Sequence, residues 1–148
     1  DTFYSCKMSD ISDTVLVIED EPDIVMFMKR VLESKGYTVE TAKNYQQAMD
    51  ALDGNANPNE SGNYSGLSKY GYIFTDNQLP GGSGIDIVKK IRGPNYNTIN
   101  PNIKIIFMSA DISGTTKSEL EGKVDLYLPK PIDMDIISRP NLEKLYTK

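Results

Sequence analysis

Short apolar segments alternate with helical patterns along this chain, and that alternation limits its possible folds more than any other feature. Five segments have the length and composition of strands: 15–18, 37–42, 72–75, 103–108 and 124–128. Helical spacing of apolar residues lies between and after them: 22–35, 45–52, 84–92, 113–121 and the remainder of the chain. Strands and helices in alternation predict a doubly wound α/β fold, with a five-stranded parallel sheet covered by helices on both faces.

Polar residues directly follow or end four of these strand segments. Glu19 and Asp20 follow the first, Asp76 the third, Ser109 the fourth, and Lys130 stands between two prolines after the fifth. The carboxyl ends of parallel strands share one edge of the sheet, which is where open α/β folds bind their ligands. The sequence therefore predicts that three carboxylates, a hydroxyl and a lysine meet in one small pocket.

Length and composition indicate one soluble globular domain. The chain has 148 residues, of which 39% are apolar and 25% charged. We expect residues 1–13 to form a tail or linker and residues 14–148 to form the domain. The stretches Asp53–Gly71 and Gly93–Asn102 are rich in turn-forming residues and are predicted to be surface loops. Pro140 indicates that the last helix starts or kinks there.

Several classes of function are disfavoured or excluded by the composition. The net charge of -5 argues against a nucleic-acid surface, which needs clustered Lys and Arg. The chain contains no histidine, which excludes a Ser/His/Asp triad, histidine zinc sites and a phosphohistidine of its own. Cys6 is the only cysteine, so no internal disulfide forms. No apolar run approaches the roughly 20 residues of a membrane helix, and no signal-peptide pattern precedes the first strand, so we expect a cytoplasmic protein.

The residues at the strand ends suit phosphoryl chemistry assisted by a divalent cation. Asp20 and Asp76 can supply the carboxylate oxygens that Mg2+ prefers, and acids crowded at one edge repel each other without a cation. Asp76 can also attack phosphorus and form an aspartyl phosphate, with Lys130 as the partner of a phosphoryl oxygen. Each residue alone has a simpler reading, as a solvated acid, a turn cap or a surface lysine, and only their joint occurrence favours the phosphoryl site.

Four stretches of the sequence together resemble the receiver domain of two-component response regulators. They are VLVIEDEPDI, FTDNQLPGGSGIDIVKKIR, IIFMSA and LYLPKPID, in the order of that family and at the right strand ends. The resemblance covers about Val15 to Ile137. It implies a flavodoxin-like sheet with strand order 2-1-3-4-5 and a role in two-component or phosphorelay signalling. The two long loops also resemble those of receivers attached to hybrid histidine kinases.

The resemblance implies a role for each residue of the cation site. Asp76 matches the phosphoacceptor, which takes its phosphoryl group from a phosphohistidine on a histidine kinase or a histidine phosphotransfer protein. Asp20 matches the direct ligand of Mg2+, which Mn2+ can replace, and Glu19 matches its acidic companion. Gln78 would lend its backbone carbonyl to the same cation, which Asp76 also ligates.

The resemblance also implies how phosphorylation changes the surface. Lys130 matches the lysine that holds the acceptor or its phosphate. Ser109 and Tyr127 match the pair of residues that shift toward the phosphate and turn inward, which alters a partner-binding surface around the fourth helix and fifth strand. The domain would thus catalyse its own phosphorylation and dephosphorylation without being a turnover enzyme. A dimer formed on phosphorylation is compatible with such a surface, whereas direct nucleic-acid binding and membrane insertion are not expected.

Two other functions stay open on the sequence alone. One is a Mg2+-dependent phosphohydrolase with Asp76 as nucleophile, although Gln78 stands where such enzymes need an acid. The other is a receiver that binds partners without being phosphorylated. The sequence does not name the cognate kinase, the pathway or the output.

Overall fold

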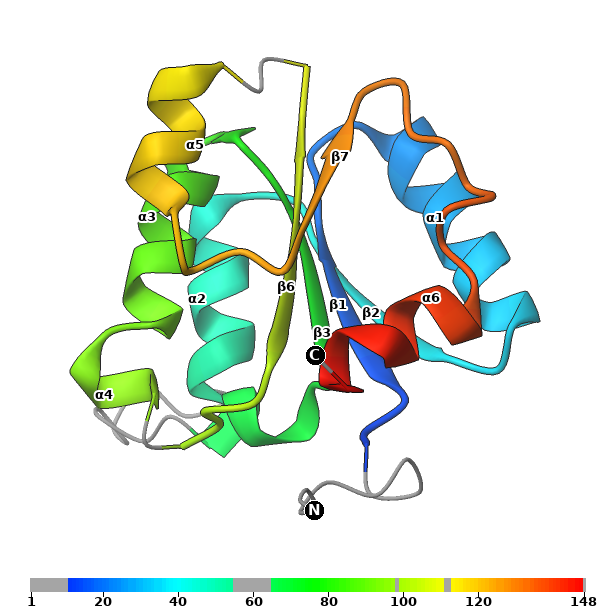
Figure 1. Cartoon of the computed structure of the whole chain (residues 1–148), viewed down its shortest axis with the longest axis horizontal. Helices are drawn as coiled ribbons and strands as arrows, with labels where there is room; N and C mark the ends of the chain where they lie inside the picture. Colours follow the sequence, from blue (N-terminus) through cyan, green and yellow to red (C-terminus); the bar gives the residue numbers. More distant parts are fainter. Residues whose placement is uncertain (1–10, 55–64, 98, 111–112, 148) are drawn as a thin grey trace.

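A parallel sheet of five strands runs through the centre of the molecule (Figure 1). The computed structural model describes residues 11–54, 65–97, 99–110 and 113–147. The strands of this sheet are β1 (Thr14–Ile18), β2 (Thr38–Ala42), β3 (Tyr72–Asp76), β6 (Lys104–Ser109) and β7 (Leu126–Pro129). Their order is β2-β1-β3-β6-β7, with every neighbouring pair parallel. Counted within this sheet, the order is the expected 2-1-3-4-5, which confirms the flavodoxin-like fold.

Helices cover both faces of the sheet, as predicted (Figure 1). One face carries α1 (Pro22–Ser34) and the short α6 (Arg139–Glu143). The other carries α2 (Tyr45–Asp53), α3 (Gly84–Ile91) and α5 (Gly114–Leu120). Because successive strand residues point to opposite faces, β1 contributes Val15 and Val17 to one core and Leu16 and Ile18 to the other. The sheet is therefore buried on both faces, which explains the continuous apolar runs of its central strands.

Side-chain caps fix where most of these helices begin. Asn44, Ser83, Ser113 and Ser138 each accept a hydrogen bond from a backbone N–H in the first turn of the helix that follows. Pro140 lies in the first turn of α6, where a missing N–H costs nothing. The prediction that the last helix starts near this proline is confirmed.

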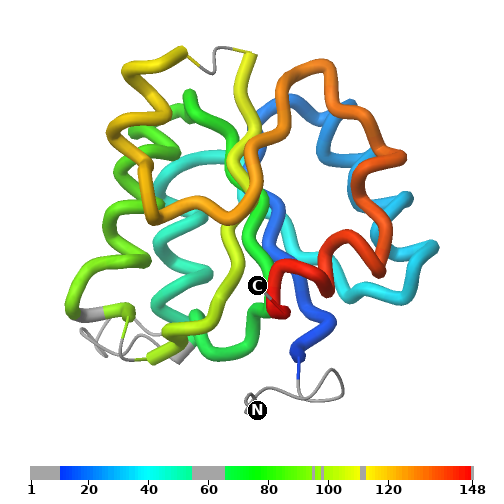
Figure 2. The backbone as a smooth tube through the Cα atoms, in the orientation of Figure 1, coloured from blue at the N-terminus to red at the C-terminus, as the bar shows by residue number. Residues whose placement is uncertain are grey.

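Two segments predicted to be surface loops contain buried structure instead. In the first, Ser65–Lys69 forms a 3-10 helix with Leu67 buried, while residues 55–64 lie outside the described residues. In the second, α4 (Pro94–Asn97) buries Tyr96. The two segments lie side by side at the sheet edge opposite the strand carboxyl ends (Figure 2), since the side-chain amide of Asn100 donates to the carbonyl of Leu67 at 3.1 Å. Buried apolar side chains and hydrogen bonds between the two segments fold them into packed structure despite their turn-forming composition.

The chain after β7 is also less helical than expected. Among residues 130–147, helical structure is limited to α6 and a 3-10 helix at Lys144–Thr147, so the prediction of a helix over the whole remainder is wrong. The connection instead packs Ile132, Met134 and Ile137 against the core on the α1 side. Within the described residues, every helix is too short or too polar to span a bilayer.

Candidate functional site

Strand register brings the predicted site residues to one edge of the sheet. Asp76 pairs with Met108 between β3 and β6, and Ser109 pairs with Pro129 between β6 and β7. The backbone N–H of Lys130 then donates to the carbonyl of Ser109 at 3.0 Å. These side chains therefore leave the sheet at successive positions along its carboxyl edge, as the sequence predicts.

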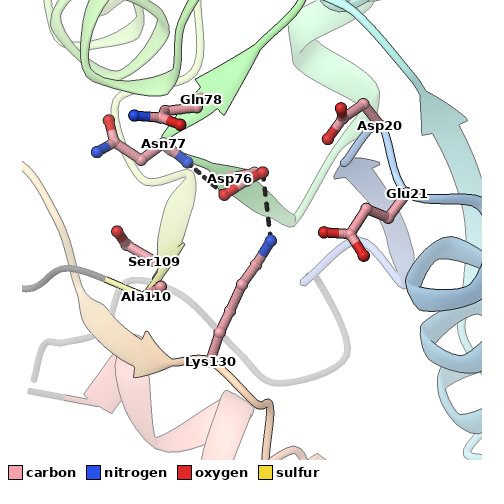
Figure 3. A pocket seen from close by; sticks show the side chains of 8 residues that line it. All are labelled: Asp20, Glu21, Asp76, Asn77, Gln78, Ser109, Ala110 and Lys130. Atoms are coloured by element: carbon pink, nitrogen blue, oxygen red, sulfur yellow. Dashed lines mark hydrogen bonds and ion pairs between the residues drawn. The ribbon is translucent and has the colours of Figure 1, made fainter.

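A cavity of about 370 Å³ opens at this edge (Figure 3). Eight residues line it: Asp20, Glu21, Asp76, Asn77, Gln78, Ser109, Ala110 and Lys130. Five of them, Asp20, Asp76, Gln78, Ser109 and Lys130, are predicted site residues. The other two predicted site residues, Glu19 and Tyr127, do not line this cavity.

Asp76 is held by neighbours on both sides of its carboxylate. The residue is 8% exposed. Its Oδ1 accepts a hydrogen bond from the backbone N–H of Asn77 at 2.8 Å, and its Oδ2 lies 3.3 Å from Nζ of Lys130. Figure 3 shows the carboxylate between these two partners. A carboxylate fixed in this way presents an oxygen to the cavity in a defined direction.

The turn after Asp76 folds back against it. A short antiparallel hairpin, β4 (Gln78–Leu79) and β5 (Gly82–Ser83), returns the chain to its starting point, and the N–H of Gly84 donates to the carbonyl of Asn77 at 2.6 Å. A Cβ atom on Gly84 would collide with the backbone carbonyl of Asp76. Glycine is therefore required at this position. The glycines and prolines of the turn signal a tight geometry in the sequence, but not this contact.

Lys130 forms ion pairs with two carboxylates. Its Nζ is 2.7 Å from Oε1 of Glu19 and 3.3 Å from Oδ2 of Asp76. Burial opposes the charged form of Lys130, but the contacts with Glu19 and Asp76 outweigh it and raise the pKa of the ammonium. Burial also raises the pKa of Glu19, against the opposing effects of Lys130 and of the Glu21 backbone N–H. The peptide bond between Lys130 and Pro131 is cis.

The acidic residues fit a hard divalent cation. One carboxylate oxygen from each of Glu19, Asp20 and Asp76 lies within 4.8 Å of the others. The donors are all oxygens, which suits Mg2+, Mn2+ or Ca2+ better than a soft metal. Glu21 adds a further carboxylate to the cavity wall, while Lys130 supplies the cavity's ammonium group. The resulting excess of negative charge favours a cation here.

Ser109 and Tyr127 lie on the neighbouring strands β6 and β7, and only Ser109 lines the cavity. Ser109 lines the cavity and is 3% exposed. Tyr127 packs edge-on against Phe107, with ring centroids 6.4 Å apart, and Nζ of Lys117 lies 5.6 Å from its ring centre. Burial raises the pKa of Tyr127. Its ring thus lies beside Lys117 of α5 and does not line the cavity.

Three cavity residues were not among the predicted site residues. Asn77 contributes its backbone N–H to Asp76, Glu21 follows the predicted acidic pair, and Ala110 follows Ser109. Each is adjacent in sequence to a predicted residue, and this adjacency is the signal that could have identified them.

Comparison with known proteins shows which family and which relatives this chain resembles. The model of the response regulator receiver domain matches residues 15–139. The transcriptional regulatory protein TcrA of Mycobacterium tuberculosis is 29% identical over 122 residues, which are 82% of this chain and 41% of TcrA. The chain thus spans less than half the length of this curated relative.

Solved structures show the same fold. The Francisella response regulator 1452 receiver domain has 27% identity and a TM-score of 0.68, with 90% of this chain and 96% of that chain covered. A response regulator protein from Burkholderia pseudomallei, solved with a phosphorylated aspartic acid, a calcium ion and citrate, has 22% identity and a TM-score of 0.66. That comparison covers 90% of this chain and 71% of the other.

Proposed function

Because this chain belongs to the family of response regulator receiver domains, we propose that Asp76 is its phosphoacceptor and that phosphorylation there switches a partner-binding surface. One observation carries the proposal. The carboxylate of Asp76 faces a cavity at the carboxyl edge of the sheet, with Nζ of Lys130 3.3 Å from Oδ2 and with Ser109 lining the same cavity. A nucleophilic carboxylate, the ammonium group of Lys130 and a hydroxyl donor are thereby available to one phosphoryl group.

The donor would be a phosphohistidine on a histidine kinase or a histidine phosphotransfer protein. An oxygen of Asp76 would form the new bond to phosphorus while the bond between phosphorus and the imidazole nitrogen breaks, and its electron pair returns to the imidazole. The N–H of Asn77 holds Oδ1 of Asp76 and so orients the carboxylate. The ammonium of Lys130 would contact the phosphoryl oxygens and partly neutralise their charge.

The cation of the reaction would be Mg2+, which Mn2+ can replace. We assign its ligands to the carboxylates of Asp20 and Asp76 and to the backbone carbonyl of Gln78, with Glu19 as a nearby negative charge. The oxygen-only donor set and the proximity of the carboxylates support this assignment. When bound, the cation would offset the negative charge of the phosphoryl oxygens. The calcium ion in the related Burkholderia pseudomallei protein also supports a divalent cation.

The output of phosphorylation would be a change at the surface formed by α5 and β7. A phosphoryl group adds about -1.5 to -2 charges and three acceptor oxygens beside Ser109. Ser109 lies on β6, which pairs with β7, and the ring of Tyr127 on β7 lies beside Lys117 of α5. A shift of Ser109 toward the phosphate would therefore displace Tyr127, because β6 and β7 are adjacent strands. A partner protein, or a second copy of the chain, would read the altered surface.

A signalling role is favoured over hydrolysis of phosphate esters. A phosphohydrolase that uses Asp76 as its nucleophile would need an acid at the position of Gln78, and an amide cannot transfer the proton. We therefore propose that the domain phosphorylates and dephosphorylates itself but does not turn over a substrate. Multiple turnover of a phosphate ester by the purified protein would contradict this choice.

Labelling by a small phosphodonor tests the acceptor. Acetyl phosphate with Mg2+ should add one phosphoryl group to the wild-type chain, detected by intact mass, and EDTA should prevent the addition. Asp76→Asn should abolish labelling because an amide oxygen is a poor nucleophile. Asp50→Asn, an exposed aspartate on α2, serves as the matched control and should label normally. Undiminished labelling of Asp76→Asn would overturn the assignment.

A further inference from the structure

Lys130 lies closer to Glu19 than to the proposed phosphoacceptor. Its Nζ is 2.7 Å from Glu19 but 3.3 Å from Asp76. The side chain of Glu19 is 0% exposed, whereas that of Lys130 is 16% exposed. The closer ion pair of the lysine is therefore with the acid whose side chain is fully buried.

Both oxygens of Glu19 have a partner within the protein, Oε1 in an ion pair and Oε2 in a hydrogen bond. Oε1 contacts Nζ of Lys130, and Oε2 accepts a hydrogen bond from the backbone N–H of Glu21 at 3.1 Å. Among the described residues, Glu19 forms ion pairs only with Lys130. Asp20 differs, since it is exposed and lines the cavity. The two neighbouring acids are thus placed for different tasks.

We propose that Glu19 is a positioning residue for Lys130, which holds the ammonium beside Asp76 and keeps it from pairing fully with that carboxylate. The role of the positioned lysine toward a phosphoryl group rests on the proposed function, but the pairing itself does not. The longer side chain of glutamate matters here. An aspartate at this position would withdraw the carboxylate by about one carbon–carbon bond, ~1.5 Å.

The pairing couples the lysine to the cation. If Lys130 moves toward a phosphoryl group, Glu19 loses its counter-charge in a fully buried position, where an unpaired carboxylate is strongly disfavoured. A cation held by Asp20 and Asp76 lies close enough to replace it, because the three carboxylates are within 4.8 Å. Movement of Lys130 toward a phosphoryl group and binding of the cation should therefore favour each other.

A double-mutant cycle in EDTA, without phosphodonor, tests the pairing by thermal unfolding. Lys130→Met should lower the melting temperature by roughly 5–15 °C because it leaves Glu19 buried and unpaired. Glu19→Gln should lower the melting temperature of the wild-type chain but raise that of Lys130→Met. Equal shifts of the same sign in both backgrounds would overturn the proposal. If Lys130→Met does not fold in EDTA, folding of the double variant supports the proposal, and its failure to fold refutes it.

Two further variants separate lysine positioning from cation binding. Asp50→Asn is the matched control and should shift the melting temperature equally in both backgrounds, because Asp50 is exposed on α2 and forms no ion pair with Lys130 among the described residues. Glu19→Asp keeps the charge and the ligand type but shortens the reach, so it should lower the melting temperature in EDTA. A Glu19→Asp chain as stable in EDTA as the wild type would refute the positioning role.

Titration with Mg2+ provides a second readout. Calorimetry should show that Lys130→Met binds Mg2+ several-fold more tightly than the wild type, because Glu19 then lacks any other counter-charge. Equal or weaker binding would contradict the coupling. Both measurements are independent of phosphoryl transfer, so a chain that passes them but is not labelled at Asp76 would overturn only the proposed function.

Discussion

Replacing Gly84 with alanine is expected to displace the phosphoacceptor strand itself. Gly84 is the first residue of α3, and a Cβ atom there would meet the carbonyl oxygen and carbon of Asp76 and lie 3.1 Å from Oγ1 of Thr75. The closest atoms belong to the backbone, which cannot rotate away as a flexible side chain can. Either α3 or the end of β3 must therefore shift.

The size of the effect follows from two opposing contributions. Overpacking of this kind typically costs about 1–3 kcal/mol, and the better helix propensity of alanine offsets up to ~1 kcal/mol. A net loss of about 1–2 kcal/mol lowers the melting temperature of a chain of this length by roughly 2–8 °C. A shift of Asp76 by about 1 Å should also slow its phosphorylation by up to ~100-fold, since transfer depends on close alignment.

Gly114→Ala is the matched control for this variant. Gly114 is likewise the first residue of a helix that a serine caps, but a Cβ atom there has no neighbour within 4 Å among the described residues. This variant should melt at or slightly above the wild-type temperature and label at the wild-type rate. Thermal unfolding and labelling by acetyl phosphate measure both variants. If Gly84→Ala behaves like Gly114→Ala in both assays, the close approach to Asp76 is refuted.

Two further predictions concern the rest of the fold. Asp125→Ala should lower the free energy of unfolding by about 1–3 kcal/mol in urea titrations, because one oxygen of Asp125 serves both Arg92 at 2.9 Å and the N–H of Ile105 at 2.8 Å. Glu119→Ala, which breaks an exposed ion pair, should cost under ~1 kcal/mol, and equal losses would contradict this ranking. Burial raises the pKa of Tyr72. Its phenol is therefore protonated in both the folded and the unfolded chain below pH ~10, whereas above pH ~10 it ionises first in the unfolded chain. Stability should then fall as the pH rises, by up to ~1.4 kcal/mol per unit for this group, and Tyr72→Phe should flatten the slope between pH 10 and 11; an unchanged slope would refute the assignment.

The strands and their polar ends are readable in the sequence because their signals are local. A run such as Val15 to Ile18 is apolar on every residue, as expected of a strand buried on both faces. The residue after such a strand must lie at the carboxyl edge of a parallel sheet. That rule alone brings Asp76, Ser109 and Lys130 to one cavity without any knowledge of distances.

Composition misleads where contacts between distant segments decide the structure. The stretch Asp53–Gly71 has the residues of a loop, yet Leu67 and Tyr70 are buried and the phenol of Tyr70 donates to Glu40 at 2.7 Å. The partner lies on β2, far away along the chain. No local sequence pattern predicts such a contact, because turn-forming residues are compatible with both an exposed loop and a packed segment.

By itself, the sequence determined the sheet, its cationic and anionic edge residues and the family, since each depends on periodicity or on adjacency to a strand end. Only the tertiary structure decided how these residues share their partners. It pairs Lys130 more closely with Glu19 than with Asp76, turns Tyr127 toward α5, and leaves room for nothing but glycine at Gly84. The physical reason is that charge pairing and close packing depend on distances of a few tenths of an ångström between segments that are remote in sequence.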